Sequence, residues 1–150
     1  MLGFEFQLSI PYFATFRKPT STSLILSYSV PPYTTLRGLL SNALGLTRDD
    51  YSLQDWIKIG ICPPMDLNRF KEMTKILKLK GTGQTYNHLF PSSPMSKELL
   101  FRPNYRIFLA GNEEKITQVY SALQDPKRPL YIGASDDLVD IEVSKPVKVE

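Results

Sequence analysis

Two consecutive prolines, Pro31 and Pro32, stand immediately before an amphipathic segment. A proline pair cannot lie inside a helix or a central strand, but proline is accepted where a helix begins. The residues that follow predict a helix that Thr34 or Thr35 caps and that Gly45 ends in a left-handed turn. Its apolar residues share one face, and they are Leu36, Leu39, Leu40, Ala43 and Leu44. The chain must therefore turn at the prolines and lay this helix against a core.

The segment before the prolines is basic and rich in hydroxyl side chains. The predicted helix places Arg37 in its first turn, where a cation opposes the helix macrodipole unless an anion lies nearby. Side-chain cations and the free N–H groups of a helix N-terminus together suit phosphate. We therefore interpret residues 13–46 as a phosphate-binding surface.

With 150 residues the chain has the commonest size of one domain, so we expect a single domain over residues 1–150. Lys and Arg number 18 against 15 Asp and Glu, a mild excess that is unevenly spread. Basic residues concentrate in residues 1–48 and 58–80, while the acids gather in residues 49–55 and after residue 112. This pattern fits nucleic-acid binding and a set of solvated basic faces about equally well.

Cys62 and His88 are the only cysteine and the only histidine. This excludes an internal disulfide and the usual Cys/His zinc sites, and we expect neither a metal nor a cofactor. No apolar run approaches the roughly 20 residues that span a bilayer. The start of the chain also lacks the basic region and cleavage site of a signal peptide. We therefore expect a protein of the reducing cytoplasm that does not bind a membrane.

Apolar and polar residues alternate over residues 2–10, which predicts a half-buried strand that Pro11 ends. A second strand is predicted over residues 56–62. Residues 66–79 fit either a helix or an extended arm, and we favour the extended form slightly. Residues 80–98 are too rich in Gly, Pro, Ser and Thr for a core element, so we expect a long loop or a protruding arm, with the whole arm at about 66–100.

A third strand is predicted over residues 104–111, followed by a helix that Asn112 caps. A fourth strand is predicted over residues 128–135, and residues 139–150 look like a further extended segment. The buried stripe of the helix is predicted to be Ile116, Val119, Tyr120 and Leu123. The order of elements predicts an α+β, ferredoxin-like β-α-β-β-α-β domain, with the arm inserted as a hairpin between the second and third strands.

Several short motifs carry a family resemblance. Phe-Arg-Lys-Pro at residues 16–19, Tyr-Ser-Val-Pro-Pro at 28–32 and Gly-Leu-Leu-Ser-Asn-Ala-Leu-Gly at 38–45 occur in this order. Leu-Phe-Arg-Pro-Asn-Tyr at 100–105 and Pro-Leu-Tyr-Ile-Gly-Ala-Ser at 129–135 follow them. Together they resemble the signature of the CRISPR-associated Cas5 family, a branch of the RAMP proteins, over most of the chain.

The resemblance implies a subunit of a type I CRISPR surveillance complex, or Cascade, with a role in antiviral defence. Members of the family hold the 5′ handle of the CRISPR RNA (crRNA) and cap the complex beside its large subunit and its last backbone subunit. The implied partners are therefore the crRNA, these two subunits and, through the complex, the target DNA.

Residues 17–42 carry the three kinds of side chain that grip single-stranded RNA. Cations bind phosphates, aromatic rings stack on bases, and hydroxyl or amide groups bind sugars and base edges. The predicted RNA-binding residues are Arg17, Lys18, Thr20, Ser21, Thr22, Ser23, Tyr28, Tyr33, Arg37, Ser41 and Asn42. The alternative is that Tyr28 is a core or edge aromatic and that the hydroxyl run forms a turn. We expect Gly38 to allow close packing of the helix on the sheet.

In the family a thumb-like hairpin at the position of the arm reaches toward the guide RNA, displaces a nucleotide and contacts the adjacent backbone subunit. The arm of this chain carries residues suited to RNA or partner contact. They are Lys78, Lys80, Gln84, Tyr86, Asn87, His88, Leu89 and Phe90. A disordered loop is the alternative for this region.

Catalysis is the competing function. One subtype of the family cuts its own repeat RNA without metal, using a tyrosine and an adjacent Lys-His pair as acid–base groups. Here His88 follows Asn87, and Lys80 lies eight positions away in the sequence. We therefore predict a non-catalytic RNA-binding subunit without catalytic residues, and keep a metal-independent repeat-RNA endoribonuclease as the alternative.

Overall fold

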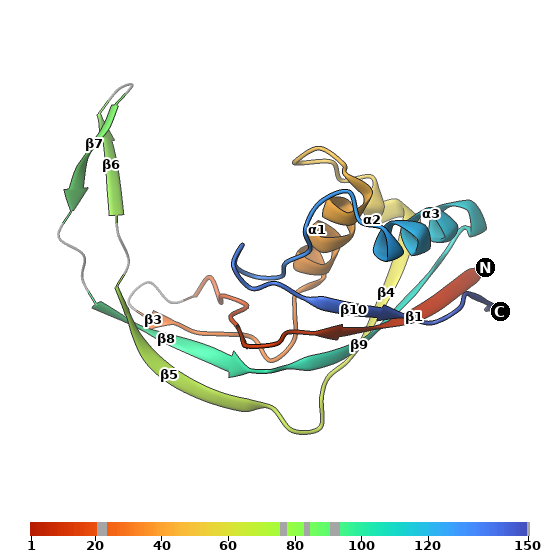
Figure 1. Cartoon of the computed structure of the whole chain (residues 1–150), viewed down its shortest axis with the longest axis horizontal. Coiled ribbons are helices and arrows are strands. Elements are labelled where there is room, and N and C mark those ends of the chain that lie inside the picture. Colours follow the sequence, from red (N-terminus) through yellow and green to blue (C-terminus); the bar gives the residue numbers. More distant parts are fainter. Residues whose placement is uncertain (21–23, 76–77, 83–84, 91–93, 150) are drawn as a thin grey trace.

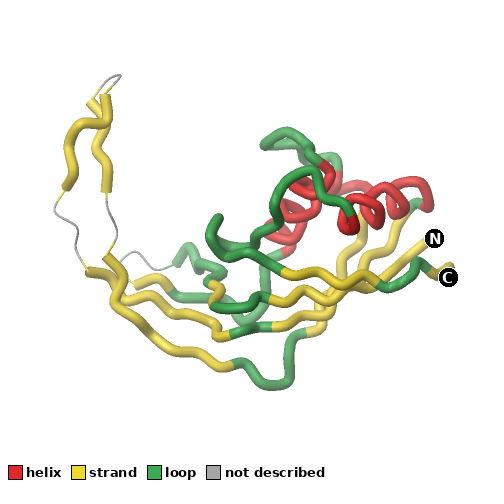
Figure 2. The backbone as a smooth tube through the Cα atoms, in the orientation of Figure 1, coloured by secondary structure: helices red, strands yellow, loops and turns green. Residues whose placement is uncertain are grey.

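The computed structural model describes residues 1–20, 24–75, 78–82, 85–90 and 94–149, with residues 78–82 and 85–90 described by their backbone. Two β-sheets follow one another along the long axis of the molecule, and the helices cover only one of them (Figures 1 and 2). The chain therefore has the α+β class that the sequence predicts.

The main sheet is antiparallel and is centred on β1 (Leu2–Ser9) and β9 (Asn104–Gly111), which pair over the full length of both strands. β4 (Ile57–Cys62) pairs with the other edge of β9. β10 (Asp140–Val143) and β11 (Val147–Lys148) pair with the other edge of β1. The strand order is β10-β1-β9-β4, and β1 and β4 run parallel because both are antiparallel to β9.

These strands confirm the predictions made from periodicity for the first, second and third strands. In β1, Phe4, Phe6 and Leu8 are buried, whereas Glu5 and Gln7 reach the surface. α1 (Tyr33–Leu44) and α3 (Glu113–Gln124) cover the buried face of the sheet (Figure 2). A short helix that the sequence did not predict, α2 (Leu53–Trp56), leads into β4. The buried helical residues of the core are Leu36, Leu39, Leu40, Ala43, Leu53, Ile116, Val119 and Leu123.

Two details of α3 test the prediction for this helix. Asn112 caps it, because the Asn112 side-chain oxygen accepts a hydrogen bond of 3.0 Å from the Glu114 N–H. The cap is the one predicted. Tyr120 packs edge-on against Phe4, with 5.4 Å between ring centres, but it is only half-buried. It therefore lies at the edge of the core and not in its interior.

The start of α1 differs from the prediction. Pro32 is the N-cap, no side chain of a described residue caps the helix, and the Thr35 and Leu36 N–H groups donate to the Pro32 carbonyl. The predicted caps at Thr34 and Thr35 are therefore wrong, because the proline pair leads straight into the first turn. Arg37 then lies beyond the first turn, where the helix macrodipole acts only weakly. The macrodipole thus supplies little reason for an anion at Arg37.

The end of α1 matches the prediction. Gly45 has φ 73°, and its N–H donates to the Asn42 carbonyl. Gly38, in the middle of α1, is exposed, and a Cβ placed there would meet no atom within 4 Å. The predicted close packing of Gly38 on the sheet is therefore wrong.

The arm region is built from strands. β5 (Asn68–Lys75) pairs along its whole length with β8 (Pro94–Phe101), and β2 (Phe13–Ala14) and β3 (Leu24–Ile25) line the other edge of β8. The extended prediction for residues 66–79 is thus confirmed over β5. Residues 80–98 are not one long loop, because most of their described residues are in strands, which the high content of Gly, Pro, Ser and Thr concealed.

A separate hairpin of β6 (Lys78–Thr82) and β7 (Thr85–Phe90) forms the outer part of the arm. In Figure 1 this hairpin lies beyond the end of β5 and β8 that is farthest from the helices. The hairpin thus lies in the segment for which the sequence predicts a protruding arm.

The fourth predicted strand, residues 128–135, is wrong. The chain turns there instead: Gly133 has φ 82°, the Ala134 N–H donates to the Asp137 carboxylate, and the Ile132 N–H donates to the Asp137 carbonyl. Ile132 is buried as the anchor of this loop, which explains the apolar run that resembled a strand. The strand that completes the sheet is β10, within the segment predicted only as extended.

Two glycines of α1 give a matched test of stability. Gly45→Ala is expected to lower the free energy of unfolding by about 1–2 kcal/mol, because alanine is strained in the left-handed region. Its Cβ would also lie 3.0 Å from the Lys127 Cβ. Gly38→Ala is expected to raise the free energy of unfolding by about 0.5–1 kcal/mol, since alanine favours a helix interior. Urea denaturation measures both, and changes of the same sign would contradict this description of α1.

Candidate nucleic-acid interface

The basic segment before the prolines folds back on itself beside β8. The Lys18 N–H donates to the Leu26 carbonyl and the Tyr28 N–H donates to the Phe16 carbonyl, both over 2.8 Å. Arg17 and Ser27 form an isolated β-bridge between the two sides of this turn. The backbone pairing therefore fixes the positions of three of the predicted RNA-binding residues, Arg17, Lys18 and Tyr28.

The side chains of this segment are available to a ligand. Arg17 is exposed and makes no hydrogen bond or ion pair with another described residue, and Thr20 is exposed. The Lys18 ammonium lies 5.4 Å from the centre of the Tyr28 ring, and Tyr28 is 38% exposed. Tyr28 is therefore not a core residue. The predicted residues Ser21, Thr22 and Ser23 lie outside the described residues.

Glu98 of β8 ties this segment to the base of the arm. One Glu98 carboxylate oxygen accepts the Ser27 N–H over 2.8 Å, and the other lies 3.4 Å from a guanidinium nitrogen of Arg69. Arg69 also donates to the Ser29 hydroxyl, and the Tyr105 hydroxyl donates to the Ser29 carbonyl over 2.8 Å. The sequence analysis missed this network because its members come from four separate segments. No spacing in the sequence relates them.

Ionisation of this network follows from its contacts. Burial tends to raise the pKa of Glu98, but the Ser27 N–H and the Arg69 guanidinium outweigh it and hold this pKa below its ordinary value. Burial raises the pKa of the Tyr105 phenol. At neutral pH Glu98 is therefore an anion and Tyr105 a neutral donor, as the hydrogen bonds require.

The Glu98 network predicts a pH dependence of stability. A carboxyl whose pKa is lower in the folded than in the unfolded chain stabilises the fold above its unfolded pKa. That stabilisation is lost as the pH falls through the folded pKa. Glu98→Gln is therefore expected to lower the free energy of unfolding by about 1 kcal/mol at neutral pH and to flatten its fall below about pH 4.5.

Glu142→Gln, at an exposed position of β10, is the matched control and should follow the wild type. Urea denaturation across the acid range measures the free energy of unfolding of all three proteins. Parallel curves for Glu98→Gln and the wild type would contradict the role of Glu98.

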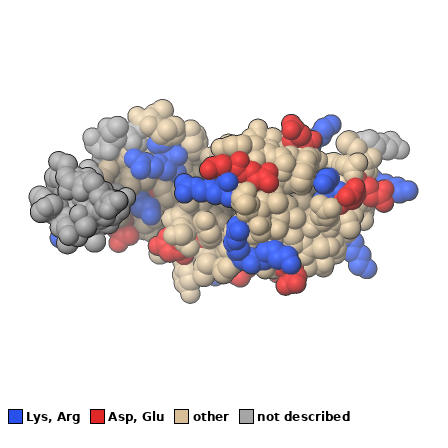
Figure 3. Space-filling model, turned by 90° about the horizontal axis from the view of Figure 1, so that it is seen from above, with Lys and Arg blue, Asp and Glu red and all other residues tan. Residues whose placement is uncertain are grey.

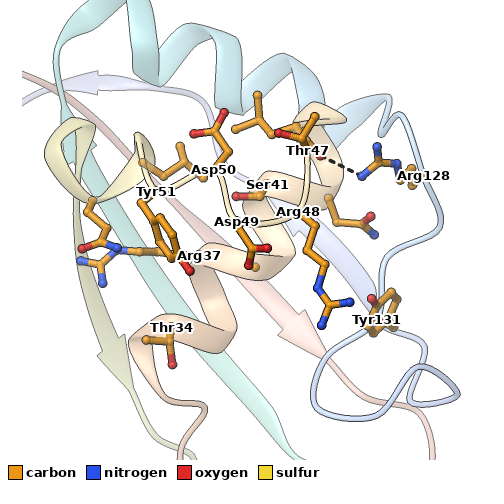
Figure 4. A pocket seen from close by; sticks show the side chains of 15 residues that line it. Thr34, Arg37, Ser41, Thr47, Arg48, Asp49, Asp50, Tyr51, Arg128 and Tyr131 are labelled. Atoms are coloured by element: carbon orange, nitrogen blue, oxygen red, sulfur yellow. Dashed lines mark hydrogen bonds between the residues drawn. The ribbon is translucent and has the colours of Figure 1, made fainter. Parts of the chain in front are cut away.

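The second group of predicted residues lies in a different place. Arg37, Ser41 and Asn42 line a pocket of about 620 Å³ on α1 (Figure 4). The other lining residues are Thr34, Gly38, Leu46, Thr47, Arg48, Asp49, Asp50, Tyr51, Leu53, Gln54, Arg128 and Tyr131. Arg17, Lys18 and Tyr28 do not line it, and neither does Tyr33, which is 51% exposed. The predicted set therefore divides into two groups.

Within the pocket the predicted residues have different roles. The Asn42 amide donates to the Pro129 carbonyl over 2.7 Å, so it supports the pocket wall. The Nε of Arg37 is buried without a hydrogen-bond partner. Sequence reasoning missed Arg48, Tyr51, Arg128 and Tyr131, which only the tertiary fold brings to α1.

On the helix-covered side of the molecule, the basic side chains of the described residues do not form one continuous patch (Figure 3). Figure 3 views the molecule from the helix-covered side, and there Lys and Arg lie singly or in small groups with Asp and Glu between them. The local arrangement of cations and aromatic rings, rather than net charge, therefore marks candidate contacts.

The arm places seven predicted residues on the β6–β7 hairpin, which are Lys78, Lys80, Tyr86, Asn87, His88, Leu89 and Phe90. Lys80 and His88 are directly opposed in the register of the two strands. Gln84 lies outside the described residues.

The described residues form neither a metal site nor a membrane-spanning helix. Among the described residues no three His, Cys, Asp or Glu side chains come together as metal ligands. None of the helices in the described parts of the chain is long and apolar enough to cross a membrane.

Comparisons with known proteins give a family and a fold. The family model for CRISPR-associated protein Cas5 (Cas_Cas5d) matches residues 3–149. No curated protein matches the chain significantly in sequence. A solved chain of a CRISPR RNA-guided surveillance complex aligns with a TM-score of 0.70 and 16% identity, over 91% of this chain and 60% of that one.

A second solved structure, described as a Cas protein, aligns with a TM-score of 0.58 and 19% identity, over 91% of this chain and 58% of that one. At these identities the likeness shows a shared fold. The chain thus spans about three fifths of the length of the solved chains that it matches.

Proposed function

Because the chain belongs to the Cas5 family of CRISPR-associated proteins, we propose that it is a non-catalytic, crRNA-binding subunit of a type I CRISPR surveillance complex. In this proposal it holds the 5′ handle of the crRNA and caps the backbone of the complex next to the large subunit, in the cytoplasm. The observation that carries the proposal is the family match over residues 3–149, nearly the whole chain.

The topology supports a ferredoxin-like, RAMP-type domain. The strand order β10-β1-β9-β4, with α1 after β1 and α3 after β9, is the order of a β-α-β-β-α-β unit. The arm is inserted between β4 and β9, which are the second and third strands of that unit. In this reading residues 1–150 form one domain, and β5 to β8 are its arm.

The chemistry of the basic segment supports RNA as the ligand. Arg17 offers an exposed guanidinium to a phosphate, and Tyr28 offers an exposed ring to a base, with Lys18 close to that ring. The Glu98 network holds the backbone of this turn in place, so these side chains are positioned before RNA arrives. Preorganisation of this kind lowers the entropic cost of binding.

The arm supplies the proposed partner contact. A two-stranded hairpin that projects from the sheet has no hydrophobic core of its own and is only marginally stable in isolation. We propose that the β6–β7 hairpin lies against the adjacent backbone subunit and the guide RNA. Contact with target DNA would be indirect, through the assembled complex.

Binding to repeat RNA with and without the 5′ handle tests the RNA role. The wild type is expected to bind handle-bearing RNA more tightly. Arg17→Ala is expected to weaken this binding about three- to tenfold and to reduce the slope of log K against log salt by about 0.7, the share of one phosphate contact. Filter binding at several salt concentrations measures both quantities.

Lys145→Ala removes an exposed cation on the segment between β10 and β11 and serves as the matched control. It is expected to leave affinity and salt slope near the wild-type values. Equal affinity of the wild type for RNA with and without the handle would count against the proposed role.

A metal-independent endoribonuclease is the second candidate. The observation that favours it is the register of the arm hairpin, in which Lys80 opposes His88 although eight positions separate them in the sequence. Incubation of the purified protein with labelled repeat RNA in chelator decides between the two functions. We expect intact RNA, and cleavage that is lost in His88→Ala would replace the non-catalytic proposal.

A further inference from the structure

The pocket on α1 has the size of a binding site for a small molecule or a single nucleotide. Its volume is about 620 Å³, within the usual range of ligand sites. Its walls come from α1, from the segment between α1 and α2, from the start of α2, and from the loop after α3. The motifs that carry the family resemblance include parts of α1 and of the loop after α3, but not the segment between α1 and α2 that brings Arg48 and Tyr51 to the pocket.

Hydrogen bonds hold the wall in place. The Lys127 N–H donates to the Ala43 carbonyl over 2.9 Å, and the Arg128 guanidinium donates to the Leu46 carbonyl over 3.0 Å. The Asn42 amide adds its bond to the Pro129 carbonyl. The first of these bonds satisfies a carbonyl in the last turn of α1 that would otherwise lack a partner, and the other two join the chain just beyond α1 and α1 itself to the loop after α3. The pocket is therefore formed before any ligand binds.

Two arginine side chains of the pocket have no partner within the described part of the chain. The side chains of Arg37 and Arg48 make no hydrogen bond or ion pair with another described residue, and the Arg37 Nε is buried. A buried N–H without an acceptor is uncommon in folded proteins. Burial removes its hydrogen bond to water, and the free energy of that bond is not recovered. A phosphate oxygen is a strong acceptor for such a group.

Gly38 leaves space beside Arg37. It lies in the interior of α1 and lines the pocket, and no atom lies within 4 Å of a Cβ built on it. Among helix-interior residues only proline is less favourable than glycine. Since packing within the protein does not require a glycine here, the open surface is available to a ligand that approaches the helix backbone.

Aromatic rings and carboxylates complete the lining. Tyr51 is 65% exposed and Tyr131 is 41% exposed, and Figure 4 shows them on opposite sides of the pocket. Asp49 and Asp50 lie with the three arginines, which leaves one net positive charge. A simple anion would gain little from the tyrosines and would be repelled by the carboxylates. A nucleotide offers a phosphate to the arginines and a base that can stack on a tyrosine ring. The amino groups of a base can also donate hydrogen bonds to the carboxylates.

We propose that this pocket binds one unstacked nucleotide of single-stranded RNA, with the phosphate at Arg37 and Arg48 and the base against the ring of Tyr51 or Tyr131. The inference rests on the proposed function, since it assumes that the chain binds guide RNA. It adds a second contact region, separate from the basic segment that contains Arg17.

Filling the pocket tests the proposal without weakening the fold. Gly38→Leu puts a side chain into the space above α1 and improves helix propensity. Its affinity for handle-bearing repeat RNA is expected to fall about tenfold, as expected when one stacked base is lost. Its melting temperature should equal or exceed that of the wild type. Tyr51→Ala, at an exposed position, is the second variant and should weaken binding to a similar extent.

Ser121→Leu, at an exposed position of α3, is the matched control and should bind RNA within twofold of the wild type. Repeat RNA that carries photoreactive 4-thiouridine gives a positional readout. Crosslinks mapped to Tyr51, Tyr131 or their neighbours in the pocket support the proposal.

The outcomes separate the two levels of inference. Wild-type affinity in both Gly38→Leu and Tyr51→Ala, with RNA still bound, would overturn the nucleotide pocket and leave the proposed function standing. Failure of the wild type to bind repeat RNA would overturn the proposed function and the pocket with it.

Discussion

The antiparallel pairing of β1 with β9 is the interaction on which the rest of the structure depends. The two strands pair along all of their residues, and each offers its other edge to further strands, β10 and β11 on one side and β4 on the other. The face they bury carries Phe4, Phe6 and Leu8 from β1 and Tyr105, Ile107 and Leu109 from β9. The apolar faces of α1 and α3 are buried because they pack against this surface of the sheet.

The same pairing also positions the arm. β8 runs into β9 through a short break at Arg102 and Pro103, so the second sheet begins where the main sheet ends. Glu98 and Tyr105, on either side of that break, both bind the segment that contains Ser27 and Ser29. A buried phenol and a stabilised carboxylate thus link the core, the base of the arm and the turn that displays Arg17 and Tyr28.

Periodicity was a sufficient guide wherever an element buries one face against the main sheet. The alternation in β1 and the stripes of α1 and α3 predicted both the elements and most of their buried residues. Prediction was less successful where tertiary contacts determine the local conformation of the chain. Ile132 anchors a loop rather than a strand, because the bonds to Asp137 close the chain at Gly133. β5 and β8 are extended because each supplies the other's hydrogen bonds, which composition does not reveal.

The candidate sites follow the same division. Arg17, Lys18 and Tyr28 were identifiable because they are neighbours in one short turn. The pocket was not, because Arg48, Tyr51 and Tyr131 reach α1 only through the fold, and Gly38 was predicted to pack inward. The free space at Gly38 and the buried Nε of Arg37, which has no hydrogen-bond partner among the described residues, can be recognised only in three dimensions.

The most direct measurement of the central claim is the composition of the assembled complex. The chain would be co-expressed with the backbone and large subunits of its CRISPR system and a repeat-spacer RNA, and the complex would be purified through the backbone subunit. Native mass spectrometry is predicted to find one copy of the chain together with the RNA and both subunits. Recovery of an RNA-bearing backbone and large subunit without this chain would contradict the account.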